Sequence, residues 1–357
     1  MAQDIRRLVR GRPLRLMEVC GTHTVAIARL GLRSLLPEEI RLISGPGCPV
    51  CVTPQGIIDK MIARAGQPGT ILATFGDMLS VPGTSSSLKA EKARGADVRV
   101  ICSPLQALDL ARANPSRRVV LPAIGFETTQ APLAATVWEA QETGLENFFL
   151  IAAGRLIPPA LKFLFADPEI RIDGLLCPGH VSVIIGLEPY RRLVHHYRVP
   201  CAVAGFEPID ILGGIRELVD QAASGRAEAV NLYPRAVRDG GNPRARREIE
   251  RVFKPAAAEW RGMGTIPASG LEIRGEYRRF DIDRYDPIDI PPPIEPPGCI
   301  CGQVIKGAAS PADCPRFGSG CDPSHPLGPC MISAEGACAA WFRYGGGKNG
   351  FNRESDR

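Results

Sequence analysis

Short apolar runs that alternate with amphipathic stretches constrain the fold of this 357-residue chain more than any other feature. The runs are rich in Val, Ile and Leu and lack strict polar–apolar alternation, which is typical of strands buried in a parallel sheet. A capping residue before proline, as in Ser103-Pro104, predicts helix starts between the runs. This order predicts an α/β fold with parallel sheets. The predicted strands lie at residues 14–19, 40–44, 70–75, 98–102, 119–124, 148–152, 174–177 and 201–204.

Two pairs of segments repeat weakly along this part of the chain. Residues 119–128 (VVLPAIGFET) resemble residues 200–208 (PCAVAGFEP), since in both an apolar run ends in Gly-Phe-Glu. Residues 45–49 and 177–180 share a turn built on Pro and Gly. Two similar α/β units that face each other would produce this pattern, and so would chance likeness between turns.

The termini and the composition narrow the class of protein. The N-terminus, MAQDIRRLVRGRP, lacks an apolar core of signal-peptide length, and no run approaches the ~20 apolar residues of a membrane helix. We therefore expect a cytoplasmic protein with no membrane partner. A net charge of +5 and 6% aromatic residues are too little to predict nucleic-acid binding. The sequence contains no nucleotide-binding or serine-hydrolase motif.

Six of the twelve cysteines crowd into residues 299–338, after a proline-rich stretch at 291–298 that is typical of a stiff linker. A segment with this much Gly and Pro cannot build an apolar core and needs disulfides or a metal. Disulfides are rare in the cytosol, which leaves zinc or an iron–sulfur cluster. The C-x-x-C pairs usual in zinc ribbons are missing, so the pattern favours [4Fe-4S]. The candidate ligands are Cys301, Cys314, Cys321 and Cys338, with Cys330 in the last gap.

A Cys-Pro-Val-Cys motif at Cys48 and Cys51 lies between a strand predicted to end near Ser44 and a helix predicted to begin near Pro54. Such a motif is half of a metal site or a redox dithiol. Open α/β sheets place their sites at the carboxyl ends of strands. A helix N-terminus also favours thiolates, that of Cys51 most. We therefore expect this pair to be functional.

A second strand-to-helix turn carries Cys20 and His23 in the sequence Cys-Gly-Thr-His. Either residue alone would more often be structural, but together in such a turn they favour function. Cys20, Cys48 and Cys51 would supply three thiolates that bind one iron ion and leave a position open. His23 would be a neighbour or a fourth ligand, placed to orient a thiolate or accept a proton.

Weaker signals complete the pattern. Residues 125–129, 178–180 and 205–210 each place a glycine and a polar group at a strand end, where loop capping explains them as well as function does. Residues 242–263 predict one basic amphipathic helix. Three cysteines within apolar runs are expected in the core: Cys102, Cys177 and Cys201.

Taken together, these motifs resemble the signature segments of the HypD family of hydrogenase maturation factors. The likeness runs from about Leu14 to Tyr344. No single segment is specific, but the combination is. The matching segments are residues 17–24, 45–51, 125–129, 177–180, 205–210 and 335–340.

The resemblance implies two Rossmann-like parallel-sheet domains that face a cleft, and a small cysteine-rich domain that holds a [4Fe-4S] cluster. We expect the first domain at residues 1–124, joined by a returning segment at 242–287. The second is expected at 125–241, and the linker with the cluster domain at 288–357.

The resemblance also implies partners and a task. The chain would pair with a small HypC-like protein, and the pair would carry the iron on which the Fe(CN)2CO group of [NiFe] hydrogenases is assembled. A HypE-like protein would donate cyanide, and the finished group would pass to the hydrogenase large subunit. Cys20, Cys48 and Cys51 fall on the family's essential cleft cysteines. The cluster ligands would be Cys301, Cys314, Cys321 and Cys338, although Cys330 lies in a segment that also looks family-like.

Two other classes stay open from the sequence. In a stand-alone thiol–disulfide oxidoreductase, Cys48 and Cys51 would cycle as a disulfide fed by the cluster, and Cys20 would be dispensable. A structural zinc protein that binds partners would be colourless, whereas an iron–sulfur protein is brown.

Overall fold

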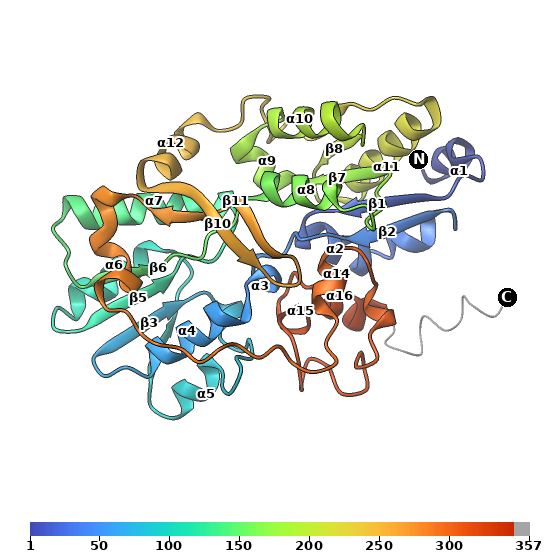
Figure 1. Ribbon diagram of the computed structural model, residues 1–357. Helices are drawn as coiled ribbons and strands as arrows, with labels where there is room; N and C mark the ends of the chain where they lie inside the picture. Colours follow the sequence, from blue (N-terminus) through green and yellow to red (C-terminus); the bar gives the residue numbers. More distant parts are fainter. Residues whose placement is uncertain (346–357) are drawn as a thin grey trace. The chain divides into compact units, whose positions relative to one another are not determined.

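The computed structural model describes residues 1–345, and their contacts divide into two compact units (Figure 1). Unit 1 comprises Met1–Val52, Ile157–Pro243 and, within the described part of the chain, residues 298–345. Unit 2 comprises Thr53–Leu156 and Arg244–Pro297. Within residues 1–345, no helix is long and apolar enough to cross a membrane.

Unit 1 is built on a parallel five-stranded sheet with the order β2-β1-β7-β8-β9. The apolar runs form these strands as predicted, except that the short β9 was missed. Because β1 lies between β2 and β7, the first fifty residues join a sheet whose other strands come much later in the chain. The strands are β1 (Leu14–Glu18), β2 (Ile40–Ser44), β7 (Gly174–Pro178), β8 (Cys201–Ala204) and β9 (Ala229–Asn231).

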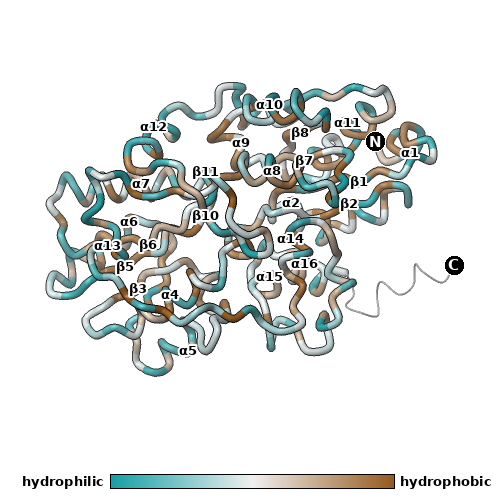
Figure 2. Tube along the Cα trace, viewed as in Figure 1, coloured by the Kyte–Doolittle hydropathy of each residue, from teal (hydrophilic) through white to brown (hydrophobic). Residues whose placement is uncertain are grey.

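Helix α11 packs against β7, β8 and α1, and its apolar face supplies Ile211, Ile215 and Leu218 to the core of unit 1. Figure 2 shows hydrophobic residues gathered along these elements. The helices of unit 1 are α1 (Ala2–Val9), α2 (Gly21–Arg29), α3 (Pro49–Val52), α8 (Ile157–Ala166), α9 (Gly179–Ile185), α10 (Glu188–Tyr197), α11 (Pro208–Ser224), α14 (Cys301–Ile305), α15 (Pro329–Ile332) and α16 (Ala337–Tyr344), with 3-10 turns at Leu32–Leu35 and Pro311–Asp313.

Unit 2 holds a parallel four-stranded sheet with the order β4-β3-β5-β6. All four strands coincide with predicted apolar runs. They are β3 (Thr70–Thr74), β4 (Asp97–Val100), β5 (Arg118–Pro122) and β6 (Phe148–Ile151). The helices are α4 (Gln55–Ala65), α5 (Leu88–Ala93), α6 (Leu105–Ala113), α7 (Glu127–Glu142), α12 (Pro243–Val252) and α13 (Ile282–Tyr285), with 3-10 turns at Gly76–Met78 and Gly275–Phe280.

The prediction of one helix over residues 242–263 was wrong in its second half. Helix α12 ends at Val252, and the chain continues as β10 (Phe253–Trp260), which pairs in antiparallel fashion with β11 (Gly264–Ile273). Pro255 is one reason, because proline has no N–H for a helical hydrogen bond.

The two contact units are drawn along other bounds than the predicted ranges 1–124, 125–241 and 288–357, which stay a prediction. Strand pairing explains the difference: β1 bonds to β7 across more than 150 residues, which sequence periodicity cannot reveal. By its contacts the cysteine-rich segment groups with unit 1, where α16 packs on α2. Residues 346–357 of the predicted third domain lie outside the described part of the chain. The predicted cleft between two Rossmann-like domains stays a prediction.

Candidate functional site

Four strand-end turns of unit 1 lie along one edge of its sheet. Cys20 follows β1, Cys48 follows β2, His180 follows β7 and Glu207 follows β8. Because these strands are parallel and neighbours in the order β2-β1-β7-β8, their carboxyl ends share one edge. The motif at residues 125–129 instead follows β5 in unit 2.

The turns that carry Cys20 and Cys48 pack directly on each other. The N–H of Gly21 donates to the carbonyl of Gly47 at 3.0 Å. A Cβ added at Gly47 would lie 2.3 Å from the backbone nitrogen of Cys20 and 2.6 Å from the carbonyl carbon of Val19. The glycine before Cys48 therefore lets two backbones approach more closely than any side chain would allow.

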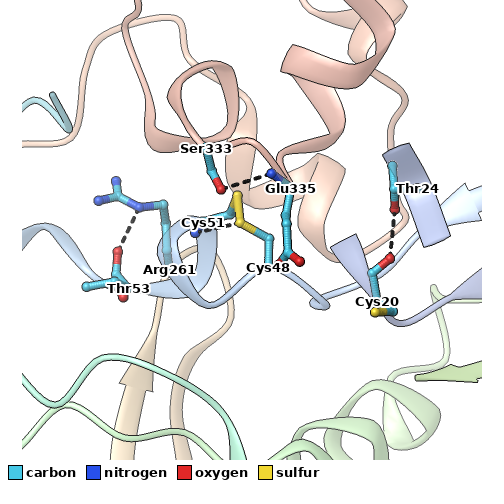
Figure 3. Close-up of a disulfide and its surroundings, with 8 residues drawn as sticks. All are labelled: Cys20, Thr24, Cys48, Cys51, Thr53, Arg261, Ser333 and Glu335. Atoms are coloured by element: carbon cyan, nitrogen blue, oxygen red, sulfur yellow. Dashed lines mark hydrogen bonds between the residues drawn. A yellow bond between two sulfur atoms is a disulfide. The ribbon is translucent and has the colours of Figure 1, made fainter. Parts of the chain in front are cut away.

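Cys48 and Cys51 form a disulfide in this structure (Figure 3), with their Cα atoms 5.3 Å apart. Both residues belong to the turn that leads into and through the short helix α3, and the N–H of Cys51 lies 3.1 Å from Sγ of Cys48. Both are buried. The predicted preference of Cys51 for the thiolate form stays a prediction, because a disulfide sulfur does not titrate.

Cys20 is a buried thiol at the N-cap of α2. Burial, followed by the nearby carboxylate of Glu335, raises the pKa of this thiol to about 11. The N–H groups of His23 and Thr22 act in the opposite direction but are outweighed. The Cys20 side chain is therefore protonated in this state, and binding a cation would have to displace its proton.

His23 is fully buried and faces the β8 turn. Its Nε2 lies 2.8 Å from the carbonyl oxygen of Gly205, so Nε2–H is the donor and the ring is held in one tautomer. The ring packs on Phe206, 4.8 Å between centroids, and Phe206 stacks on His180 at 4.1 Å. Burial lowers the pKa of His23 to about 4. The turns after β1, β7 and β8 are thus joined by one stack of rings.

All six cysteines of the C-terminal segment line one pocket of unit 1. The thiols of Cys301 and Cys338 both hydrogen-bond to the sulfur of Cys330, which also receives the N–H groups at the start of α16 and so has a lowered pKa. The pKa of the Cys301 thiol is raised by its hydrogen bonds with Cys299 and Cys330 and by burial. The pKa of the Cys338 thiol is raised by its hydrogen bond with Cys330 and by burial. The remaining lining cysteines are Cys299, Cys314 and Cys321.

This donor set fits an iron–sulfur cluster better than a single ion. A single zinc ion would bring four sulfurs to about 2.3 Å from one centre. Among residues 1–345, no three His, Cys, Asp or Glu side chains are grouped closely enough to hold one metal ion. In a cluster each thiolate binds a different iron, so the ligands are spread around a common pocket, as these cysteines are. Cys20, Cys48 and Cys51 lie on adjoining turns, but their three sulfurs are likewise not grouped closely enough in this structure to hold one metal ion.

A second, smaller pocket adjoins the disulfide. It is lined by Cys48, Cys51, Glu335 and Gly21, and also by Cys330 from the cysteine-rich pocket. Figure 3 shows Glu335 beside the disulfide, on the loop that precedes α16. Cys330 therefore borders both the disulfide pocket and the pocket of the C-terminal cysteines.

The chain matches a protein-family model and several known proteins. The model described as "HypD: Hydrogenase formation hypA family" matches residues 1–345. The chain belongs to the HypD family. The hydrogenase maturation factor HypD of Azotobacter vinelandii is 47% identical over 94% of this chain and 90% of its own length. HypD of Escherichia coli K12 is 44% identical over 93% of this chain and 90% of its own length. A putative hydrogenase expression/formation protein of Methanocaldococcus jannaschii is 41% identical over 93% of this chain and 92% of its own length.

The HypD resemblance inferred from sequence motifs is confirmed, while one prediction about a single cysteine is wrong. Cys177 and Cys201 are buried core residues as expected. Cys102 is exposed instead, because β4 ends at Val100 and the cysteine falls in the following loop. No role was predicted for Glu335, whose Oε1 accepts the hydroxyl of Thr22 in the Cys20 turn. The only sequence signal for this residue was its place in the HypD-like segment 335–340.

Proposed function

We propose that the chain acts in the maturation of [NiFe] hydrogenases, as a scaffold on which the Fe(CN)2CO group is assembled together with a small HypC-like protein. Cyanide would come from a HypE-like donor, and the finished group would pass to the hydrogenase large subunit. The observation that carries this proposal is the packing of the Cys20 turn on the Cys48 turn at one sheet edge in a chain of the HypD family.

The iron under construction is the substrate of this site, and thiolates are suitable soft ligands for it. Before Cys48 and Cys51 can both bind iron, two electrons and two protons must convert their disulfide into two thiols. Cys20 must also lose its proton, which the positive charge of the incoming iron favours. Reduction would free the two sulfurs to rotate toward Cys20. Local rotation is needed because the three sulfurs do not yet form a metal site.

We further propose that four cysteines hold a resident [4Fe-4S] cluster, which would supply or accept single electrons. These are Cys301, Cys314, Cys321 and Cys338, all of which line one pocket. The position of Cys330 beside both pockets supports thiol redox chemistry between the C-terminal segment and the disulfide. Anaerobic protein should contain about four iron and four sulfide per chain. Stoichiometric zinc without iron would contradict the cluster, and a colourless Cys330→Ala protein beside a brown Cys301→Ala protein would change the ligand set.

The central experiment is infrared spectroscopy of the chain co-purified with its HypC-like partner, in search of cyanide and carbonyl stretches. Single substitutions Cys20→Ala, Cys48→Ala and Cys51→Ala should each abolish these bands and hydrogenase activity in cells. The brown colour of the purified protein should remain, because none of the three lines the pocket of the C-terminal cysteines.

The disulfide favours one second candidate, a thiol–disulfide oxidoreductase that uses Cys48 and Cys51. That enzyme would lose activity with either substitution but would keep most of it with Cys20→Ala. Near-normal hydrogenase maturation in the Cys20→Ala strain would therefore end the three-thiolate scaffold and leave the oxidoreductase.

A further inference from the structure

Glu335 touches the Cys20 turn at two independent points. The hydroxyl of Thr22 donates to Oε1 of Glu335 at 2.7 Å. A Cβ added at Gly21 would lie 2.4 Å from Cβ of Glu335 and 2.7 Å from its carbonyl oxygen. The first contact fixes the direction of the carboxylate, and the second is a backbone approach that only glycine permits.

The loop that carries Glu335 is itself held tightly. The N–H of Glu335 lies 3.2 Å from the hydroxyl oxygen of Ser333, and the N–H of Gly336 donates to the carbonyl of Ser333 at 3.0 Å. A Cβ at Gly336 would lie 2.0 Å from the carbonyl oxygen of Cys330. The loop therefore joins α15, which carries Cys330, to α16, which carries Cys338, with little freedom of its own.

We propose that Glu335 is a positioning residue, which accepts the Thr22 hydroxyl and thereby ties the Cys20 turn to the C-terminal cysteine segment. This inference rests on the proposed function, since it assigns the geometry of Cys20 to a contact from a segment more than 300 residues away. The carboxylate acts as a hydrogen-bond acceptor for a turn.

Positioning can be separated from a need for negative charge by conservative substitutions. Glu335→Gln keeps an oxygen acceptor and removes the charge, whereas Glu335→Ala removes both. Thr22→Ser keeps the hydroxyl, whereas Thr22→Val keeps the shape and loses the donor. Thr84→Val is a matched control, because Thr84 also donates to a carboxylate oxygen at 2.7 Å, that of Asp59 in unit 2.

The readout is hydrogen–deuterium exchange in full-length protein, at the amides of Gly21 and Thr24. Both are backbone donors within the turn, to Gly47 and Cys20 respectively. Loss of a hydrogen bond to a carboxylate should speed their exchange about tenfold. Thr22→Val and Glu335→Ala should each show this change, and the double variant should be no faster, because both remove the same contact. Glu335→Gln, Thr22→Ser and Thr84→Val should stay within about threefold of the parent.

The infrared bands of the complex with the HypC-like partner should weaken in Thr22→Val and Glu335→Ala while the visible absorbance of the cluster persists. Glu335→Gln behaving like Glu335→Ala would overturn the positioning role in favour of charge, and unchanged exchange in Thr22→Val would overturn it altogether. The Cys20→Ala variant distinguishes failure of the proposed function from failure of the role proposed for Glu335. If that variant keeps its bands, the proposed function fails. If it loses them while Thr22→Val exchanges and loads normally, only the role of Glu335 fails.

Discussion

Gly47→Ala should disrupt the candidate site by pushing apart the two turns that carry its cysteines. The added methyl group would lie 2.3 Å from the nitrogen, and 2.5 Å from Cα, of Cys20. These are backbone atoms, so no side-chain rotation relieves the clash. The same movement would break the hydrogen bond from Gly21 to the carbonyl of Gly47.

The expected cost follows from these two effects. Overpacking of a dense interior costs about 1–3 kcal/mol, and a lost backbone hydrogen bond adds about 1 kcal/mol. For a unit of 150–250 residues each kcal/mol shifts the melting temperature by about 2–4 °C, so we expect a fall of roughly 5–15 °C. The matched control is Gly213→Ala, also in unit 1, where a Cβ meets nothing within 4 Å in the middle of α11. It should stabilise by about 0.5–1 kcal/mol.

Thermal unfolding of both variants is followed by far-ultraviolet circular dichroism under anaerobic conditions. The melting temperature should fall in Gly47→Ala and rise in Gly213→Ala. If Gly47→Ala melted within 2 °C of the parent, the close approach of the two turns would be refuted. A fall of equal size in Gly213→Ala would show that the measurement reports glycine replacement in general.

Three further predictions concern buried charge and the cluster. Arg64 is fully buried and pairs with Asp286 at 3.1 Å and Asp283 at 3.6 Å. Asp283 and Asp286 are a third exposed and keep Lys60 and Arg118 as partners, so Arg64→Ala should destabilise unit 2 by about 1–3 kcal/mol, seen as faster amide exchange in β3. Burial raises the pKa of Glu18 from 4.5 to about 7. The folded state then holds this proton more tightly than the unfolded chain, so stability should fall as pH rises from about 4.5 to 7, a slope that Glu18→Gln should flatten in urea titrations. Removal of iron by a chelator, or Cys338→Ala, should speed amide exchange in α2, because α16 packs on that helix; unchanged exchange there would contradict the grouping of the C-terminal segment with unit 1.

Local sequence patterns were sufficient for most of the parallel strands, because a strand buried on both faces must be apolar throughout. They failed for β10 and β11, where alanines and prolines leave no clear alternation and the pairing partner supplies the hydrogen bonds. They also misplaced Cys102, because local patterns do not distinguish the last residue of a strand from the first residue of the following loop. The division into units depends on which strands pair, and that is a long-range property.

In the candidate site, too, local sequence patterns could not predict contacts between residues far apart in the chain. The strand-end rule brought Cys20 and Cys48 to one edge of a sheet, since it needs only the parallel direction of the strands. It had no means of finding Glu335, which reaches the site from the other end of the chain. Nor did it distinguish a dithiol from the disulfide between Cys48 and Cys51, because that depends on the oxidation state.

The placement of the cysteine-rich segment changes how its role should be understood. A segment tethered by a proline linker could carry a cluster as an independent module, and losing the cluster would then leave the Cys20 turn intact. In this chain the segment belongs to unit 1, α14 and α15 contact α3, and α16 contacts α2. Those two helices begin directly at the Cys20 and Cys48 turns. Any group that orders the cysteine pocket therefore also stabilises the backbone that presents the two turns. Assembly of iron ligands and integrity of the cluster should consequently be lost together when the C-terminal cysteines are replaced, whereas replacing Cys20 should remove only the former.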